Sequence, residues 1–517
     1  MSACRFILFA PVAACAPGHS VARVIAGAPS SVTALRTFSS TSGRSCDKSP
    51  TSSSSMSTPV SREQVERLRA EFDSCPKNKL AQNSVTKAGI NDACLSRTTL
   101  QTTNRAFSCR LPNIKPVTNQ KASGRCWIFA AMNAVRQVIA KEYNMDKFEL
   151  SQSYLYFWDK VERANYGLET IIGLIERGED DLDGRVFSFV LNSPLDDGGQ
   201  WDMISALIAK HGIVPKSCMP DAHSASNSRI FGRLITRKMR QFARDLQKLY
   251  AEEKSVEALR KAKEEMVATI YRMCCISLGT PPTQLTWEYT DKDNTYHCHQ
   301  DITPVQLYEK FVKPHFDVDN KVCLMHDPRP GHPYHDSYTV QYLGSVVGGR
   351  SIQYVNLPMD EMKEAVRKSL IDKEAVWFGC DHSKGFDRTT GFLDLTLFDY
   401  DIAFDTDLKS MDKSERIRFG DSIPGHAMMI SGFNVPTPAG QTVEEANASG
   451  KINKWCIENS WGDAMDDKGY LTATDDWFAE YVFMAVVDKR CLGADAIAAL
   501  DKPVHVLPPW DPMGTLA

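Results

Sequence analysis

The absences in this 517-residue sequence exclude several classes of protein. There is no run of about eighteen consecutive apolar residues, so no segment is expected to cross a membrane as a helix. The formal net charge is only −4, which gives no overall electrostatic reason to expect binding to nucleic acid or to an anionic membrane. The 15 cysteines follow no regular spacing, and in a chain of this length they are typical of reduced thiols in an intracellular protein.

Acidic residues are missing from the start of the chain, where no Asp or Glu precedes Asp47 and arginines lie among Ser, Thr and Ala. Such a leader is typical of a mitochondrial transit peptide, although the apolar stretch 6–15 also suits a secretory signal. A third interpretation is that translation starts at Met56. We treat residues 1–58 as a presequence or a disordered extension. We expect a cytoplasmic protein, or a mitochondrial one if residues 1–55 act as a transit peptide.

The most specific stretch of the chain is NQKASGRCWIFAAMN, which runs from Asn119 to Asn133. A polar turn is followed here by apolar residues at helical spacing, so Cys126 falls in the first turn of a predicted helix. Free N–H groups and the helix dipole favour a thiolate at that position. Gln120 lies upstream, from where its amide can donate to an oxyanion beside the sulfur. A buried, inert role is the ordinary interpretation of a cysteine, but this order of residues favours a nucleophile.

A cysteine nucleophile needs a base and a group that orients the base. His426 opens the apolar run HAMMI, which predicts a buried strand, and Asn459 follows a second strand-like run in the motif Asn-Ser-Trp-Gly. Trp461 is placed to shield a bond between these two side chains from water. Alone, the histidine indicates a core residue and the asparagine a turn residue. Together with Gln120 and Cys126 they predict a cysteine hydrolase.

The order Gln, Cys, His, Asn-Ser-Trp resembles that of papain-like cysteine peptidases. The motifs GRCWIF, DGGQWD at 197–202 and the C-terminal WDPMGTLA resemble the bleomycin hydrolase family in particular, from about residue 60 to the end. The resemblance implies an α+β fold with a papain-like core, made of a helical half and a β-barrel-like half. It also implies a large, mostly helical insertion, a C-terminal arm and a homohexamer.

The division of the chain follows from these motifs and from changes in the sequence pattern. Charged amphipathic helices predicted between Arg229 and Leu278 exceed what a small papain-like enzyme needs, so we interpret this part as an insertion. The predicted segments are 1–58 as presequence or extension, 59–224 as N-terminal extension and helical half with the cysteine, 225–360 as mainly helical insertion, 361–505 as β half with His and Asn, and 506–517 as C-terminal arm.

The resemblance also assigns substrate contacts. Gly198 and Gly199 match a segment that offers backbone hydrogen bonds to an extended substrate, although an ordinary tight turn is the alternative. The proline-rich tail implies an arm in the active-site cleft, where the carboxylate of Ala517 pairs with the α-ammonium of the substrate. The expected substrates are peptides or amides with a free amino terminus, cleaved through a thioester. Positions 123 and 196, which are cysteines in secreted relatives of papain, are Ser and Asp here, in agreement with a reducing compartment.

The spacing of the remaining histidines and cysteines gives no metal site. Cys298 lies between His297 and His299, and Cys323 precedes His326, but these spacings do not fit a zinc finger or ribbon. We therefore expect no metal and no cofactor.

Two other functions stay open from the sequence alone. Between Arg233 and Arg272 there are eleven Lys or Arg and six Asp or Glu, which raises the alternative of a nucleic-acid-binding or scaffold protein on an inactive peptidase fold. A solvated helical face is the ordinary interpretation of such a run, so nucleic acid is a weakly supported partner. A transglutaminase-like acyl transferase would use the same nucleophile chemistry.

Overall fold

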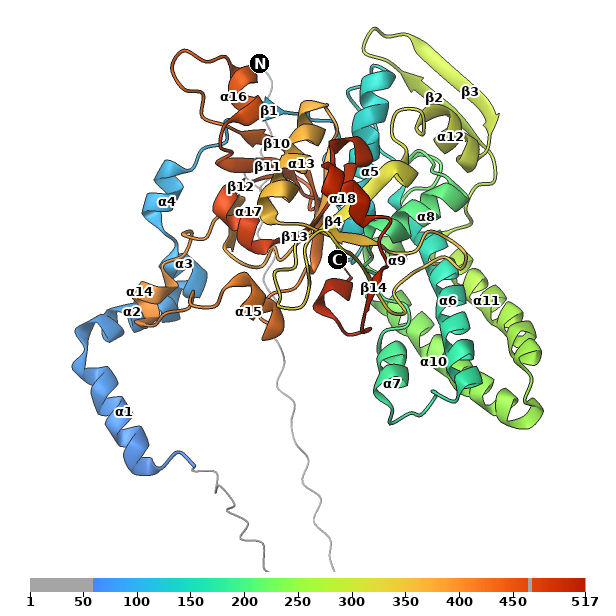
Figure 1. The fold of residues 1–517 in the computed structure, drawn as a ribbon, viewed down its shortest axis with the longest axis horizontal. Coiled ribbons are helices and arrows are strands. Elements are labelled where there is room, and N and C mark those ends of the chain that lie inside the picture. The colour runs from blue at the N-terminus through green and yellow to red at the C-terminus, as the bar shows by residue number, and fades with distance from the viewer. Residues whose placement is uncertain (1–58, 464–466, 517) are drawn as a thin grey trace, which may run out of the picture. The chain divides into compact units, whose positions relative to one another are not determined.

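The computed structural model describes residues 59–463 and 467–516 (Figure 1). Contacts divide the chain into two units, 1–68 and 69–517. The predicted presequence 1–58 lies outside the described residues. Helix α1 (Arg62–Ser74) begins after Ser61, whose hydroxyl accepts a hydrogen bond from the Gln64 N–H at 3.1 Å. Within the described ranges, none of the helices combines the length and the apolar character needed to cross a membrane.

Buried helices surround the predicted nucleophile. Helix α5 (Cys126–Glu142) begins at Cys126, as its periodicity predicts, and nearly all of its residues are buried. Both α6 (Gln152–Arg177), which is capped by Ser151, and α8 (Trp201–His211) pack against it. The shorter helices of the first half of the chain are α2 (Pro76–Ala88), α3 (Ile90–Cys94), α4 (Arg97–Thr102), α7 (Arg185–Asn192) and α9 (His223–Ser226), of which α2 to α4 lie apart from α5 (Figure 1).

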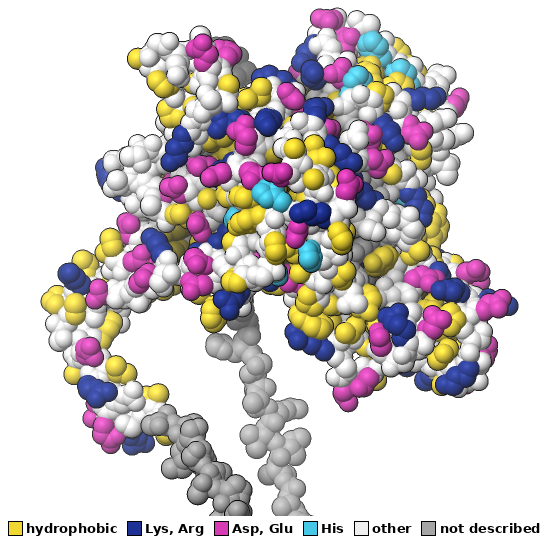
Figure 2. Space-filling view, in the orientation of Figure 1, with side chains coloured by type: hydrophobic (Ala, Val, Ile, Leu, Met, Phe, Trp, Pro, Cys, Tyr) yellow, Lys and Arg dark blue, Asp and Glu magenta, His cyan; other side chains and the backbone are white. Residues whose placement is uncertain are grey.

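The predicted pair of charged helices forms a long hairpin of α10 (Arg229–Glu253) and α11 (Val256–Leu278). Both helices pack along α6 (Figure 1). The apolar residues of α10 that recur at helical spacing are buried, as an amphipathic surface helix requires: Phe231, Ile235, Met239, Phe242 and Leu246. Figure 2 shows acidic and basic side chains interspersed over this hairpin, which favours a solvated face over a polyanion-binding one.

One large sheet holds the second half of the chain. Its central strands lie antiparallel to their neighbours in the order β13 (Val482–Asp488), β7 (Val376–Cys380), β10 (His426–Asn434), β11 (Lys454–Glu458) and β12 (Tyr470–Thr474). Strands β10 and β11 confirm the runs predicted to begin with His426 and to precede Asn459. Beyond β12 come β9 (Phe392–Leu393) and β8 (Phe386–Asp387), and β1 (Cys109–Arg110) pairs with β10.

The segment 225–360 is helical over its first half only. After α11 it forms a hairpin of β2 (Leu285–Thr290) and β3 (Tyr296–Ile302), then α12 (Pro304–Phe311). It then supplies strands to the large sheet beyond β13, in the order β4 (Lys321–Met325), β6 (Tyr354–Asn356) and β5 (Ser337–Val340). The C-terminal strand β14 (His505–Leu507) pairs with β5 at the end of this row. Buried strands this short show no alternation of apolar and polar residues, so the sequence does not indicate them. The segment boundaries stay a prediction.

The later helices cover the sheet or connect its strands. They are α13 (Met359–Ile371), α14 (Tyr400–Phe404), α15 (Lys413–Arg418), α16 (Val443–Ser449), α17 (Asp475–Tyr481) and α18 (Ala494–Ala499). Helix α13 packs on β10 and β13 through one buried face. On the site side of the molecule, α5 packs against β7 and β10. The helix that begins with the cysteine therefore lies against the strand that begins with the histidine.

A buried ion pair joins the nucleophile helix to the strand that leads to Asn459. The guanidinium of Arg136 on α5 donates to the carboxylate of Glu458, and each side chain is 1% exposed. Arg136 also donates to the Pro116 carbonyl at 2.8 Å, and the Tyr470 hydroxyl donates to Glu458 at 3.2 Å. Burial raises the pKa of Glu458, and Arg136 opposes that shift. Each charge is tolerated in the interior because the other is present.

We predict that Arg136→Met lowers the free energy of unfolding by about 3–5 kcal/mol, since it leaves Glu458 buried without its partner. Chemical denaturation measures the change. The matched control is Arg244→Met on α10, which breaks an Arg244–Asp245 pair whose side chains are 60% and 42% exposed. The control should change stability by no more than about 0.5 kcal/mol. Equal effects of the two substitutions would contradict the prediction.

Candidate active site

Cys126 is the first residue of α5 and is 3% exposed. The preceding turn is fixed by Arg125, a fully buried residue that pairs with Asp221 at 2.9 Å and donates to the Ser123 hydroxyl at 3.0 Å. Burial raises the pKa of the Cys126 thiol to about 11, while the backbone N–H groups of Ala427, Trp127 and Cys126 itself favour the thiolate. The Ala427 contact places the sulfur at the start of β10, next to His426.

His426 is held by the residues that follow β11. Its Nε2–H donates to Asn459 Oδ1 at 3.1 Å, and the Ser460 N–H donates to the same oxygen at 2.8 Å. The Asn459 Nδ2 is buried and has no hydrogen-bond partner among the described residues. The bond to Asn459 leaves Nδ1 of the imidazole free to exchange a proton with the thiol.

The charge state of this pair differs from the simplest expectation from sequence. Burial and, to a smaller extent, the neighbouring His382 lower the pKa of His426 to about 3, although the hydrogen bond to Asn459 opposes both effects. Taken singly, Cys126 and His426 are therefore both neutral in this interior. The start of a helix does not by itself ionise the thiol, because burial outweighs its N–H groups. A proton that passed from the sulfur to the imidazole would create two opposite charges close together, and each would offset part of the other's desolvation.

Gln120 is positioned by the segment that carries Asn459. Its side-chain Oε1 accepts a hydrogen bond from the Ser460 hydroxyl at 2.6 Å, and its backbone N–H donates to the Ser460 carbonyl at 2.8 Å. These contacts fix the orientation of the amide, whose Nε2 donates one hydrogen to the Ser123 carbonyl at 2.7 Å. The second hydrogen of Nε2 stays available for an oxyanion, as predicted for this residue.

Trp461 covers the histidine. Its ring centroid lies 5.3 Å from that of His426, and the guanidinium carbon of Arg388 lies 5.5 Å from the Trp461 ring centroid. Asn119 forms an isolated antiparallel bridge with Trp461, so the residue before Gln120 is also tied to the Asn-Ser-Trp segment. The indole thus packs on the imidazole at a tilt of 38°, and its shielding of the His426–Asn459 bond stays a prediction.

Gly198 and Gly199 lie beside the nucleophile helix in a rigid segment. The Trp127 indole N–H donates to the Asp197 carbonyl at 2.8 Å, and Arg163 donates to the Gly198 carbonyl at 2.8 Å. A Cβ on Gly199 would lie 2.5 Å from the Trp127 ring. Glycine is therefore needed at 199 to pack against this tryptophan, whether or not a substrate backbone also approaches.

Asp197 carries a buried charge next to this segment. Burial alone would raise the pKa of its carboxyl, but Lys160 and hydrogen bonds from Ser228 and Tyr156 hold the pKa well below its usual range. Lys160 Nζ lies 3.1 Å from Asp197 Oδ1, and the Tyr156 hydroxyl donates to the same oxygen at 2.8 Å. The charge is neutralised locally, so it fixes the segment without opposing a thiolate strongly.

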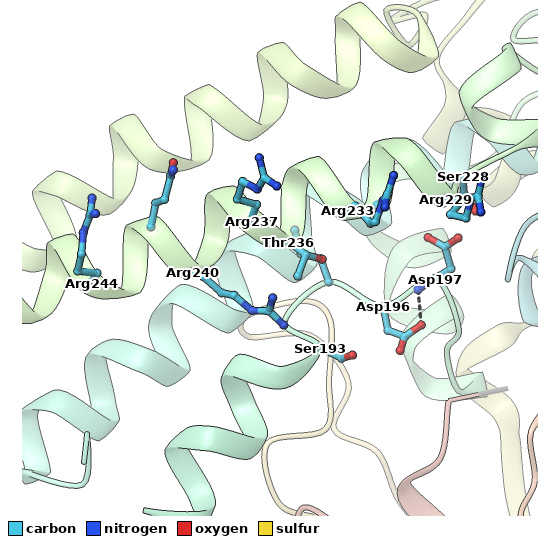
Figure 3. A pocket seen from close by; sticks show the side chains of 13 residues that line it. Ser193, Asp196, Asp197, Ser228, Arg229, Arg233, Thr236, Arg237, Arg240 and Arg244 are labelled. Carbon is cyan, nitrogen blue, oxygen red and sulfur yellow. Dashed lines mark hydrogen bonds between the residues drawn. The ribbon is translucent and has the colours of Figure 1, made fainter. Parts of the chain in front are cut away.

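Two cavities adjoin the Asp196–Gly199 segment. One, of about 690 Å³, lies between Asp196, Asp197 and a row of side chains on α10 (Figure 3): Arg229, Arg233, Thr236, Arg237, Arg240 and Arg244. The other, of about 310 Å³, lies between α6, α7 and the C-terminal residues Gly514–Leu516. Asp196 lines both cavities, so it lies between the cavity beside the α10 arginines and the cavity beside the C-terminal residues.

The C-terminal residues reach this region. They are held at Asp511, which accepts two hydrogen bonds from Arg329 at 2.8 and 3.1 Å. Met513 is fully buried, and the Thr515 carbonyl accepts a hydrogen bond from the Gln200 side chain. Ala517, whose carboxylate we predicted to bind the substrate ammonium, lies outside the described residues.

Several residues of the site were not indicated by the sequence. Arg125 and Asp197 belong to the motifs but gain their roles from distant partners, Asp221 and Lys160. His382 packs directly on His426, with 4.5 Å between ring centroids. No sequence signal could have found it, because it follows a different strand and its proximity depends on the pairing of β7 with β10.

Comparison with known proteins places these features in a family. A model of the Peptidase C1-like family matches residues 59–514. Bleomycin hydrolase from Mus musculus is 42% identical over 459 residues, which cover 89% of this chain and 99% of the relative. Aminopeptidase C from Lactobacillus delbrueckii subsp. lactis is 39% identical over 466 residues, with 89% and 99% covered. The crystal structure of PepW from Lactobacillus rhamnosis HN001 is 38% identical with a TM-score of 0.83, and 89% and 100% of the two chains are covered.

We predict that His426→Gln shifts the alkylation of Cys126 by iodoacetamide to strongly alkaline pH. Without an imidazole to take its proton, the buried thiol keeps its pKa of about 11. At pH 6 its labelling rate should therefore fall by at least about 100-fold, while the wild type reacts as the ion pair. Mass spectrometry of labelled peptides measures the rate. Asn459→Ala, which retains the imidazole, is the control and should still label at pH 6. A histidine variant that labels at pH 6 at the wild-type rate would contradict the prediction.

Proposed function

We propose that this chain, which belongs to the Peptidase C1-like family and is a cysteine aminopeptidase, cleaves peptide and amide bonds next to a free amino terminus with Cys126 as its nucleophile. The observation that carries the proposal is the position of His426, the first residue of β10. Its imidazole donates a hydrogen bond to Asn459, and the backbone N–H of the next residue, Ala427, contacts the Cys126 sulfur. The alternative of a nucleic-acid-binding scaffold is not favoured, because the complete set of Gln120, Cys126, His426 and Asn459 has no role in it.

The reaction would proceed in two halves. Cys126 gives its proton to His426, and the thiolate attacks the carbonyl carbon of the scissile bond. The Cys126 N–H and Gln120 Nε2 donate to the oxyanion that forms. His426 returns its proton to the leaving amine, which departs and leaves a thioester. The same imidazole then takes a proton from water, whose oxygen attacks the thioester and frees the acid and the thiol. Asn459 keeps the imidazole oriented throughout.

The arm is the basis for proposing an exopeptidase. Gly198 and Gly199 are proposed to bind the acyl side of the substrate, and the arm is tethered to Gln200, the next residue. An arm in that place blocks longer amino-terminal extensions. The carboxylate of Ala517, two residues beyond Thr515, is proposed to pair with the substrate α-ammonium. Substrates would therefore be peptides or amides with a free amino terminus.

A homohexamer in the cytoplasm is also proposed, from the resemblance to bleomycin hydrolase. Helix α1 supports self-association, because no residue of it is buried. Its apolar side chains Val65, Leu68 and Phe72 are 52%, 50% and 40% exposed and recur at helical spacing. A second copy of the chain would cover such a stripe. Sedimentation velocity on the intact chain tests the assembly, and a monomer at micromolar concentration rejects it.

The proposed roles predict a graded loss of kcat/KM on an aminoacyl p-nitroanilide. Cys126→Ser should abolish turnover, and His426→Ala should lower kcat/KM by about 10²–10⁴-fold, since it removes the general acid and base. Asn459→Ala should cost less than His426→Ala, because asparagine orients the base and transfers no proton. Circular dichroism verifies that the variants are folded. Indistinguishable losses for His426→Ala and Asn459→Ala would contradict the division of roles.

Deleting residues 513–517 should change substrate choice more than catalytic chemistry. Activity on a free-amine aminoacyl anilide should fall about tenfold or more, since a charge-assisted hydrogen bond is lost. Activity on amino-acetylated peptides should appear, because the blocked part of the cleft opens. The ratio of kcat/KM for the two substrates is the measurement. If a folded truncated chain still cleaves only free amino termini at wild-type rates, the role of the arm is wrong.

A further inference from the structure

A second imidazole lies against the proposed base. The ring of His382 is centred 4.5 Å from that of His426 and 5.3 Å from that of Trp461, which it meets edge-on at 77°. The sheet register explains this position. Cys380, the last residue of β7, pairs with His426, the first residue of β10, so the chain that leaves β7 passes the base two residues later.

The polar atoms of His382 are free to meet a ligand. Within residues 59–463 and 467–516, neither of its ring nitrogens makes a hydrogen bond, and the side chain is half-buried. The neighbouring Asp381 does not bind it, because its carboxylate accepts from the hydroxyls of Ser383 at 2.6 Å and Ser422 at 2.9 Å. A half-buried imidazole with an unused donor and an unused acceptor therefore lies against the proposed base His426.

The charges around His382 keep it neutral while the enzyme works. Burial lowers the pKa of His382, and Asp381 opposes that shift. His426 becomes positive in each half-reaction, and Arg388 lies near the shared Trp461 ring. A second positive imidazole would be repelled by both. A neutral imidazole keeps one N–H to donate and one nitrogen to accept.

The position of His382 assigns it to the departing half of the substrate. The acyl half lies toward Gly198 and Gly199, where Gln200 tethers the arm and α6 and α7 line the adjoining cavity. The leaving amine must lie over His426, which protonates it. The walls on that side of the imidazole are Trp461 and His382, which pack on it directly.

We propose that His382 is a specificity-determining residue for the leaving group, whose N–H donates a hydrogen bond to the carbonyl of the amino acid that departs with the amine. The inference rests on the proposed aminopeptidase function and deepens it. It implies a preference for leaving groups that are peptides or amino acids over simple aryl amines, which carry no acceptor at that position.

The test compares two substrates with the same amino-terminal residue, a tripeptide amide and a p-nitroanilide. In His382→Phe the ring still packs against His426 and Trp461 but the donor is gone. The ratio of kcat/KM, tripeptide over anilide, should fall by about 3–10-fold, the usual effect of one hydrogen bond. His382→Gln, which restores an N–H donor, should recover most of the ratio. His382→Leu serves as a second donor-free variant if the phenylalanine variant fails to fold.

The control is Phe386→Leu, which changes another aromatic contact of Trp461, 5.8 Å between centroids, without removing a donor. Its substrate ratio should stay at the wild-type value. An unchanged ratio in folded His382→Phe or His382→Leu overturns the inference, and so does a parallel fall for both substrates, which would mean that His382 merely supports His426. If the wild-type chain cleaves neither substrate, the aminopeptidase function itself fails and the inference falls with it.

Discussion

The site depends on one buried contact between the two halves of the molecule, the ion pair of Arg136 and Glu458. Arg136 lies on the helix that begins with Cys126, and Glu458 is the residue before Asn459. The proposed nucleophile and the residue proposed to orient its base are therefore carried by elements that one buried charged contact joins. An apolar contact would give comparable stability but would allow the helix to shift along the strand. Two desolvated charges are stable only when the guanidinium and the carboxylate meet in the right position. The hydrogen bonds between Gln120 and Ser460 join the same two halves of the molecule again, closer to Cys126 and His426.

The same interior explains how reactivity arises from two groups that burial keeps neutral. A thiol with a pKa of about 11 and an imidazole with a pKa of about 3 are each poor reagents alone. A proton that passed from the thiol to the imidazole would create two opposite charges close together, which would lower the cost of ionising each in the interior. In the proposed mechanism reactivity therefore depends on the pair and not on the helix start alone, so the two residues must be positioned by independent rigid elements.

The sequence alone predicts those features that depend only on residues close together in the chain. Helix α5 and strand β10 begin at Cys126 and His426 because the apolar pattern starts there, and both starts are confirmed. Features that depend on contacts between residues far apart in the chain could not be predicted from the sequence. Strand β4 is a short, buried, apolar segment without alternation, His382 depends on the β7–β10 register, and the Asp511–Arg329 anchor joins residues far apart in the chain. The predicted roles of Gln120, Cys126, His426 and Asn459 remain to be measured, although the contacts around them are compatible with each role.

The tether of the arm has a practical consequence for handling the protein. Gln200 holds the carbonyl of Thr515, and only two residues follow in the sequence. Since a residue advances the chain by at most about 3.6 Å, anything fused behind position 517 starts within about 8 Å of that carbonyl. A purification tag, a fluorescent reporter or a surface-immobilisation handle at the carboxyl end would therefore begin beside the Gly198–Gln200 segment, and it would compete with substrate for the space.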